Sequence, residues 1–263
     1  MSLAFLQTHL GVWQGWFSEC GPAGVVRGLK SSEIIFRLLA PEVIEQVNRY
    51  GEEHGHTDTE QTDAEQPEWG PAQRWVYTSL AAGLKFFADG SFSNGQIQLA
   101  PFSGFAVEQG FLWGDAKVRL VQQWDADGQV IQFTTIREAR GSRPPQTPPP
   151  WQGDGLRGTW TGTATTYLAD GWNPEQQAIT GQWSDQGCSF VRDPTATYVY
   201  FPGQIVAIFP AQLPMPTRHR DRQFALHLGW LADDRHYFHL TRRYNSEGTW
   251  QDVRCALLER VTP

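Results

Sequence analysis

The chain of 263 residues is long enough for one large domain or two ordinary ones, and its net charge of −7 argues against a protein that binds nucleic acid. Hydrophobic residues make up 40% of the chain and include 12 tryptophans, which excludes a disordered polypeptide. Glycine and proline are plentiful whereas long apolar helical runs are scarce, so the composition predicts short strands joined by many turns.

The three cysteines, Cys20, Cys188 and Cys255, are far apart in the sequence. An odd number without close spacing predicts buried free thiols in a reducing compartment rather than a disulfide framework or a zinc site. The first ten residues show neither a signal peptide nor a membrane-spanning stretch. We therefore expect a cytoplasmic protein that does not insert into a membrane and holds no metal or cofactor.

The first strong pattern along the chain is a G-x-W-x-G motif at residues 11–15. In residues 41–49, which follow, the apolar side chains fit either one face of a helix or the alternation of a barrel strand, and we interpret them as a strand. Residues 51–74 are polar and acidic, and are expected to form an inserted loop. Its segment 54–58 offers two histidines and an aspartate, but a solvated loop is a poor frame for zinc.

Five prolines between Gly141 and Pro150 predict a semi-rigid linker, because they cannot supply a helix or a central strand. Beyond the linker, residues 158–162 repeat the G-x-W-x-G motif. Further along each half, residues 110–112 (GFL) match residues 229–231 (GWL). The same patterns in the same order indicate a tandem duplication rather than a solenoid.

Strand-like runs recur within each half, and the turns Asp127-Gly128 and Glu247-Gly248 occupy corresponding hairpin positions. Such runs, spaced about 8 to 12 residues apart without helices between them, are typical of antiparallel barrels. The predicted fold is all-β, with two tandem antiparallel calycin-like barrels. The expected divisions are a first barrel at 1–140 with an acidic insertion at about 51–74, a linker at 141–155 and a second barrel at 156–263.

In a closed meander the first and last strands are antiparallel neighbours, so Trp13 should face Arg140 and Trp160 should face Arg260. A guanidinium over an indole would then close one end of each barrel. A G-x-W motif on the first strand with an arginine on the last resembles the signature of the calycins, the superfamily of lipocalins and fatty-acid-binding proteins. The duplicated pattern resembles, more narrowly, a cyanobacterial and plastid family of two-barrel calycin proteins related to a chloroplast ATP synthase biogenesis factor.

Five further residues are candidates for binding a ligand or a partner. Arg218, Arg220 and Arg222 form a dense basic cluster, which would suit an acidic protein surface or a ligand carboxylate. His227 and His239 lie on neighbouring predicted strands, and they face the same side of the sheet only in some hairpin registers. The sequence leaves that register open, and it equally leaves open whether the many aromatic side chains fill the two lumens or line cavities.

The sequence carries no G-x-S-x-G motif, glycine-rich phosphate loop or H-E-x-x-H motif, so we expect a binding protein rather than an enzyme, although a pigment lyase or isomerase stays open. The family resemblance implies an assembly or scaffolding factor in a photosynthetic cell, with ATP synthase F1 subunits as the expected partner. A cleft between two barrels on a stiff linker would grip that partner. The alternative is a carrier or sensor of a small hydrophobic ligand, such as a lipid, a bilin or another tetrapyrrole, held in a barrel lumen.

Overall fold

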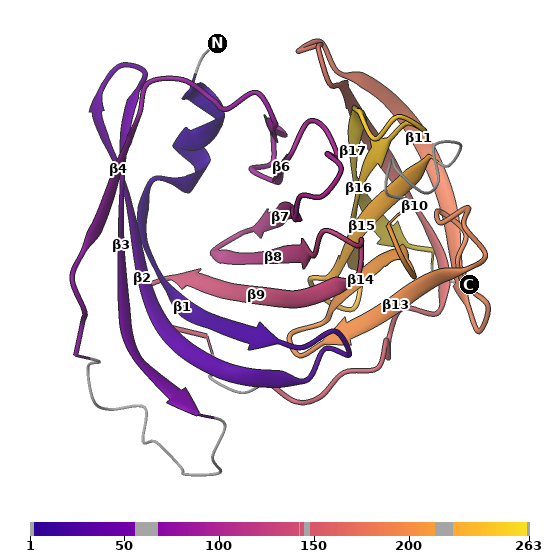
Figure 1. Ribbon diagram of the computed structural model, residues 1–263, viewed down its shortest axis with the longest axis horizontal. Coiled ribbons are helices and arrows are strands. Elements are labelled where there is room, and N and C mark those ends of the chain that lie inside the picture. Colours follow the sequence, from indigo (N-terminus) through magenta and orange to yellow (C-terminus); the bar gives the residue numbers. More distant parts are fainter. Residues whose placement is uncertain (1–2, 56–67, 142, 145–147, 214–222, 262–263) are drawn as a thin grey trace.

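The computed structural model describes residues 3–55, 68–141, 143–144, 148–213 and 223–261. Two curled antiparallel sheets contain the strands, and the prediction of an all-β protein with two tandem barrels is confirmed (Figure 1). Within the described residues, no helix has the length and apolar character needed to cross a bilayer.

The first sheet has nine strands in the hydrogen-bonded order β4-β3-β2-β1-β9-β8-β7-β6-β5, so the first long strand lies beside the last. A short 3-10 helix, η1 (Leu3–His9), precedes them. The strands are β1 (Gly11–Cys20), β2 (Val26–Ala40), β3 (Val43–Gly55), β4 (Gln73–Tyr77), β5 (Leu84–Phe86), β6 (Phe92–Gly95), β7 (Phe105–Trp113), β8 (Ala116–Trp124) and β9 (Val130–Arg140).

The second sheet has eight strands in the order β12-β11-β10-β17-β16-β15-β14-β13, which repeats the first arrangement with β10 beside β17. This shared order is the structural counterpart of the sequence repeat. The strands are β10 (Gly158–Leu168), β11 (Glu175–Ser184), β12 (Gly187–Cys188), β13 (Ala196–Phe201), β14 (Ile205–Pro210), β15 (Phe224–Leu231), β16 (His236–Tyr244) and β17 (Trp250–Arg260).

Two segments with ambiguous or unusual composition have clear places in the first sheet. Residues 43–49 belong to β3, so the interpretation of this segment as a strand is confirmed. Within the expected insertion at 51–74, β3 continues to Gly55 and β4 begins at Gln73. Residues 56–67 lie outside the described part of the chain.

The backbone geometry explains why both outer positions of each G-x-W-x-G motif are glycines. Gly11 and Gly158 adopt φ angles of 115° and 124°, which L side chains rarely adopt. A Cβ atom at Gly15 would lie 2.0 Å from a backbone oxygen of β9, and one at Gly162 would lie 2.1 Å from a backbone oxygen of β17. The motif therefore lets the first strand start at a positive φ, which glycine adopts freely, and then approach the last strand closely.

The same end of each barrel is closed by an arginine over a tryptophan. Trp13 pairs with Arg140, whose guanidinium carbon lies 4.5 Å from the indole centroid, and Trp160 pairs with Arg260 at 4.3 Å. Both indoles are fully buried and donate a hydrogen bond to the carbonyl oxygen four residues upstream, at 2.8 and 2.7 Å. The arrangement anchors the segment that enters each barrel.

The largest hydrophobic cluster lies between the two barrels, not inside either of them. The outer face of β7–β9 packs against the outer face of β14–β16, as their positions in Figure 1 suggest. Phe111 lies 5.3 Å from Phe238 between ring centroids, and Phe133 lies 5.2 Å from Phe201. The expected cleft between the barrels is therefore wrong, because the outward faces of these strands are apolar and bury each other.

Two buried cations also connect the halves. Arg242, on β16, stacks on Trp250 at 3.9 Å and donates hydrogen bonds to the carbonyl oxygens of Gly83 and Gly95 in the first half, at 3.0 and 3.2 Å. Lys85, on β5, donates to a carbonyl oxygen of the second half, that of Gly171, at 2.7 Å. These bonds replace the water that burial removes from the two charges.

Candidate functional site: the lumen of the first barrel

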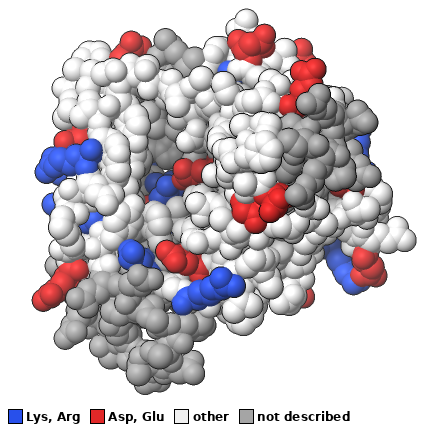
Figure 2. Space-filling view, viewed as in Figure 1, with Lys and Arg blue, Asp and Glu red and all other residues white. Residues whose placement is uncertain are grey.

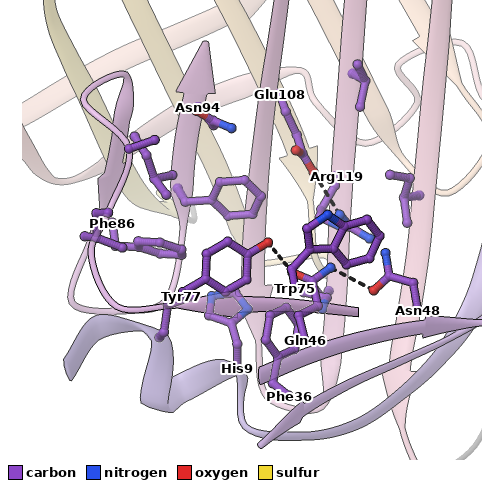
Figure 3. A pocket seen from close by; sticks show the side chains of 18 of the residues that line it. His9, Phe36, Gln46, Asn48, Trp75, Tyr77, Phe86, Asn94, Glu108 and Arg119 are labelled. Atoms are coloured by element: carbon purple, nitrogen blue, oxygen red, sulfur yellow. Dashed lines mark hydrogen bonds and ion pairs between the residues drawn. The ribbon is translucent and has the colours of Figure 1, made fainter. Parts of the chain in front are cut away.

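A cavity of about 560 Å³ occupies the lumen of the first barrel, on the concave side of the curled sheet (Figure 3). This volume is typical of pockets that hold small molecules. Its lining combines aromatic walls with a polar inner surface. The aromatic lining residues are His9, Phe17, Phe36, Tyr50, Trp75, Tyr77, Phe86 and Phe92, and the polar ones include Gln46, Asn48, Asn94, Glu108, Lys117 and Arg119.

The inner surface carries a cluster of four charged side chains. Lys117 Nζ lies 2.9 Å from Glu138 Oε2, and the two side chains are 2% and 0% exposed. Arg119 donates through Nε and Nη2 to the two carboxylate oxygens of Glu138, both at 3.2 Å, and through Nη1 to Glu108 Oε1 at 2.8 Å. Two cations and two carboxylates balance, so the cluster is neutral as a whole.

Burial and mutual attraction act in opposite directions on these groups. Burial lowers the pKa of Lys117 to about 8, although Glu138 opposes the shift. Burial alone would raise the pKa of Glu138, but Arg119 and Lys117 outweigh it and hold that pKa below its usual value. The carboxylate is therefore ionised at neutral pH, and Arg119 is charged beside it.

A row of hydrogen-bonded polar side chains runs along β3 into the cavity. Residues 46, 48 and 50 alternate along the strand and so share its inner face. The Tyr77 hydroxyl donates to Gln46 Oε1 at 3.0 Å, Gln46 Nε2 donates to Asn48 Oδ1 at 2.8 Å, and Asn48 Nδ2 donates to the Tyr50 oxygen at 3.0 Å. Figure 3 shows Tyr77, Gln46 and Asn48 on one side of the cavity and the Glu108–Arg119 pair on another.

His9 closes the cavity near the barrel end and is neutral. Its Nε2 lies 2.9 Å from the carbonyl oxygen of Gly90, and its ring packs edge-on against Phe86 at 5.4 Å. Burial and the charge of Lys117 lower the pKa of His9 to about 3. With a carbonyl as its partner, Nε2 carries the proton and donates it, so His9 adds an apolar ring face rather than a charge to the lining.

The histidines predicted as ligands lie in the lumen of the second barrel, and the predicted arginines lie outside the described residues. His227 pairs with Thr241 and His239 pairs with Gly229, so both side chains face the same side of the sheet in diagonal positions. Both line a cavity of about 790 Å³. The hairpin closes between Ala232 and His236 with a three-residue loop, 233–235. In this register the two histidines lie diagonally on one face of the sheet rather than directly opposite each other.

The two lumens correspond position by position. Lys117 pairs with Glu138 at the strand position where Tyr237 pairs with Leu258, and in both barrels the second motif glycine lies beside this position. The same registers match the rest of the charged cluster to the second barrel. The first barrel has Glu108, Lys117, Arg119 and Glu138 where the second has His227, Tyr237, His239 and Leu258.

Within the described part of the chain, no group of three or more His, Cys, Asp or Glu side chains is placed to hold a metal ion. His54 lies near the end of β3, and the other two candidate ligands of segment 54–58 fall outside the described residues. On the face seen in Figure 2, acidic and basic side chains are mixed, without a large patch of one sign.

Residues 3–143 match the model of a family described as a domain of unknown function, DUF3598, N-terminal. The protein belongs to the DUF3598 family. A solved structure of a DUF3598 protein of unknown function from Nostoc punctiforme PCC 73102 is 26% identical, with a TM-score of 0.81, and the match covers 99% of each chain. The two-barrel arrangement is thus shared by a second DUF3598 protein.

Two other solved structures match much more weakly. An S-type phycobiliprotein lyase from Guillardia theta is 8% identical with a TM-score of 0.19, over 100% of this chain and 94% of that one. A tesB protein from Mycobacterium avium subsp. paratuberculosis is 9% identical with a TM-score of 0.15, over 62% of this chain and 79% of that one. Superpositions this poor carry no argument about a DUF3598 protein, and no curated protein matches the chain.

The charged cluster of this DUF3598 protein was not predicted from the sequence, although the alternation of polar residues along two strands indicates it. Lys117 and Arg119 alternate on a strand whose other face is apolar, and Gln46, Asn48 and Tyr50 alternate in the same way on β3. Polar side chains on the inner face of a barrel strand indicate a lumen with a binding role. Because the two halves are repeats, the equivalent positions of the second half indicate which side chains line its lumen.

Proposed function

We propose that the protein binds a small molecule with a flat, largely apolar body and uncharged polar groups in the lumen of the first barrel. The observation that carries this proposal is a cavity with aromatic walls that ends at a neutral, fully paired charged cluster. Phe36, Phe86 and Phe92 supply apolar surface for the body of the ligand. The row along β3, together with Asn94, supplies donors and acceptors for its polar groups.

The charge balance argues for an uncharged ligand. Glu108 and Arg119 are already paired, and a charged ligand would have to displace one of them inside a partly buried site. An uncharged carbonyl or amide group can instead use spare lone pairs and N–H groups of Asn48 and Gln46, and the O–H group of Tyr50, without breaking an ion pair. Cyclic amides and ketones with fused or linked rings therefore fit the lumen better than fatty acids do.

The test is a fluorescence titration with Nile red, a flat and uncharged dye whose emission rises in apolar surroundings. We expect saturable binding of one dye molecule per chain. Val121→Trp, which fills the first lumen from β8, should weaken binding at least tenfold. Thr241→Trp at the corresponding position of the second lumen should leave it within twofold.

Absence of saturable binding, or equal effects of the two tryptophan variants, would overturn the proposal. Native mass spectrometry and an absorption spectrum of the freshly purified protein extend the test to the natural ligand. A bound molecule should be uncharged and should be lost in Val121→Trp.

The assembly role expected from the family resemblance stays a prediction. Its structural argument was a cleft between the barrels, and that region is filled by the shared hydrophobic core. A pull-down from a photosynthetic cell extract under mild salt tests the prediction directly. Recovery of a defined complex such as ATP synthase F1 subunits would support it, and recovery of no partner would argue against it.

A further inference from the structure

The lumen of the second barrel presents a different chemistry at the same depth as the charged cluster of the first. Three buried side chains form a hydrogen-bonded row there. The Tyr237 oxygen lies 2.9 Å from His239 Nδ1, and His239 Nε2 lies 3.1 Å from His227 Nδ1. Tyr237, His239 and His227 are 0%, 4% and 5% exposed, so each polar atom in the row needs a partner within the protein or the cavity.

The positions of the protons in this row follow from its first member. Tyr237 is fully buried, and among the described residues the acceptor in contact with its hydroxyl is His239 Nδ1. The indole of Trp183, which packs edge-on against the same ring, is a donor only. Tyr237 therefore donates to His239 Nδ1, so His239 carries its proton on Nε2 and donates it to His227 Nδ1.

His227 must then carry its own proton on Nε2. Burial lowers the pKa of His227 to about 4 and that of His239 well below its usual value, so both rings are neutral with one proton each. His227 Nδ1 is occupied by His239, with Thr241 Oγ1 also at 3.1 Å. Among the residues that the structure describes, Nε2 of His227 has no hydrogen-bond partner, and the side chain lines the cavity. The row thus ends in an unused N–H donor.

The charges around this cavity favour an anion. Among the described residues that line it, Arg192, Arg243 and Arg254 outnumber the carboxylate of Asp193. Arg243 is paired with Asp252 at 2.8 Å, whereas Arg254 is partly buried on the neighbouring strand. The first lumen, in contrast, pairs each cation with a carboxylate. Apolar lining residues, among them Ile179, Phe190 and Val191, leave room for a hydrocarbon body.

We propose that the second lumen is a separate site for an organic carboxylate, whose oxygen accepts a hydrogen bond from His227 Nε2 while the arginines of the cavity neutralise its charge. This site does not depend on the function proposed for the first lumen. It differs in ligand charge, in lining residues and in the variants that should abolish it.

The probe is 2-naphthoate, compared by isothermal titration calorimetry with 2-naphthamide, which has nearly the same shape without the charge. We expect one saturable site for 2-naphthoate and at least tenfold weaker binding of 2-naphthamide. His227→Phe removes the donor and should weaken 2-naphthoate binding at least tenfold. His227→Gln keeps an N–H donor and should stay within threefold of the natural protein.

Thr241→Trp should abolish binding of 2-naphthoate, and Val121→Trp in the first lumen should leave it within twofold. Two-bond proton–nitrogen NMR spectra of the unaltered protein give a readout that does not depend on the folding of any variant. They should show His227 and His239 as Nε2–H tautomers, with the His227 Nε2 signal shifting on addition of 2-naphthoate. Equal binding of the amide, no binding of the acid, a silent His227 signal or loss of binding in Val121→Trp alone would each overturn the proposal.

Discussion

The two lumens have the same backbone framework, but their buried polar groups are stabilised in different ways. In the first, two cations and two carboxylates pair with each other at the barrel end. In the second, a tyrosine and two neutral histidines form a hydrogen-bonded row beside a leucine. The motif glycines and the Trp–Arg stack are common to both barrels and fix the backbone, whereas the lumen side chains can diverge as a set.

They diverge as a set because a buried charge cannot stay without its partner. Replacing one member of an ion pair leaves an uncompensated charge, which costs several kcal/mol, whereas replacing both is often neutral. Glu138 has two cationic partners, and Leu258 at the equivalent position has an uncharged neighbour in Tyr237. Within each lumen the buried polar groups are therefore partners of one another. Exchanging a single side chain between the two lumens should leave a buried charge without its partner.

The largest expected effect comes from such an exchange. Glu138→Leu gives the first lumen the leucine of the second but leaves Lys117 buried without its carboxylate. The free energy of unfolding, measured by urea denaturation, should fall by about 3–5 kcal/mol. The double variant Lys117→Met with Glu138→Leu should recover most of the loss. If the single and double variants are equally unstable, the pairing argument is wrong.

The next largest effect is a dependence on pH from the neutral histidines. In the unfolded chain a histidine takes up a proton near pH 6.5, whereas burial holds the pKa of His227 at about 4 and that of His9 at about 3. Between pH 6.5 and 4 the unfolded state therefore binds more protons, so stability falls as the pH falls. His227 alone should account for about 3 kcal/mol over this range.

Urea denaturation at pH 7 and at pH 4.5 measures this loss. His227→Gln should show a smaller loss between the two pH values than the natural protein does, because glutamine does not titrate. An identical loss in both proteins would show that His227 takes up its proton over the same pH range in the folded state as in the unfolded chain.

A smaller effect on the free energy of unfolding is expected from replacing the arginine at either barrel end, and it should differ between the two ends. Arg260 stacks on Trp160 and donates hydrogen bonds to the carbonyl oxygens of Gly155, Arg157 and Asp234. Arg140, which stacks on Trp13, donates through Nη2 to the carbonyl oxygen of Thr8, and its Nε has no partner among the residues that the structure describes. Arg260→Met should cost about 2 kcal/mol of unfolding free energy and Arg140→Met about 1 kcal/mol. The reverse order in thermal or urea unfolding would contradict this reading.

The smallest expected effect concerns the row of polar side chains on β3. Tyr77→Phe removes the hydroxyl that donates to Gln46 and should cost about 1 kcal/mol of unfolding free energy, the net value of one such hydrogen bond. Nile red should still bind, with its affinity changed by less than tenfold. A complete loss of dye binding would mean that the hydroxyl contacts the ligand directly.

Much of the fold follows from local patterns in the sequence. The repeated G-x-W-x-G motifs with their terminal arginines predict the contacts of Trp13 with Arg140 and of Trp160 with Arg260, because first and last strands are neighbours in a meander. The positive φ angles of Gly128 and Gly248 likewise fit the predicted hairpin turns. These features depend on residues close in sequence or on topology alone.

The binding site was harder to predict, because it is assembled from separate strands. Lys117 and Glu138 are neighbours only through the register of β8 on β9, and Gln46 reaches the same lumen from β3. For His227 and His239, a shift of one residue in the hairpin would have placed the two side chains on opposite faces. Hydrophobic alternation also could not tell which apolar face of β15 or β16 points inward, since both are buried.

The all-β class, the duplication, the barrel ends and the turns follow from the amino-acid sequence, because glycine geometry, strand alternation and the pairing of first with last strand are local or topological constraints. Only the folded arrangement shows that the aromatic side chains join the two barrels back to back and that both lumens stay open. It alone decided which polar groups meet inside them. Those outcomes depend on strand register and on which face of each sheet finds a partner, and no single stretch of the chain encodes either.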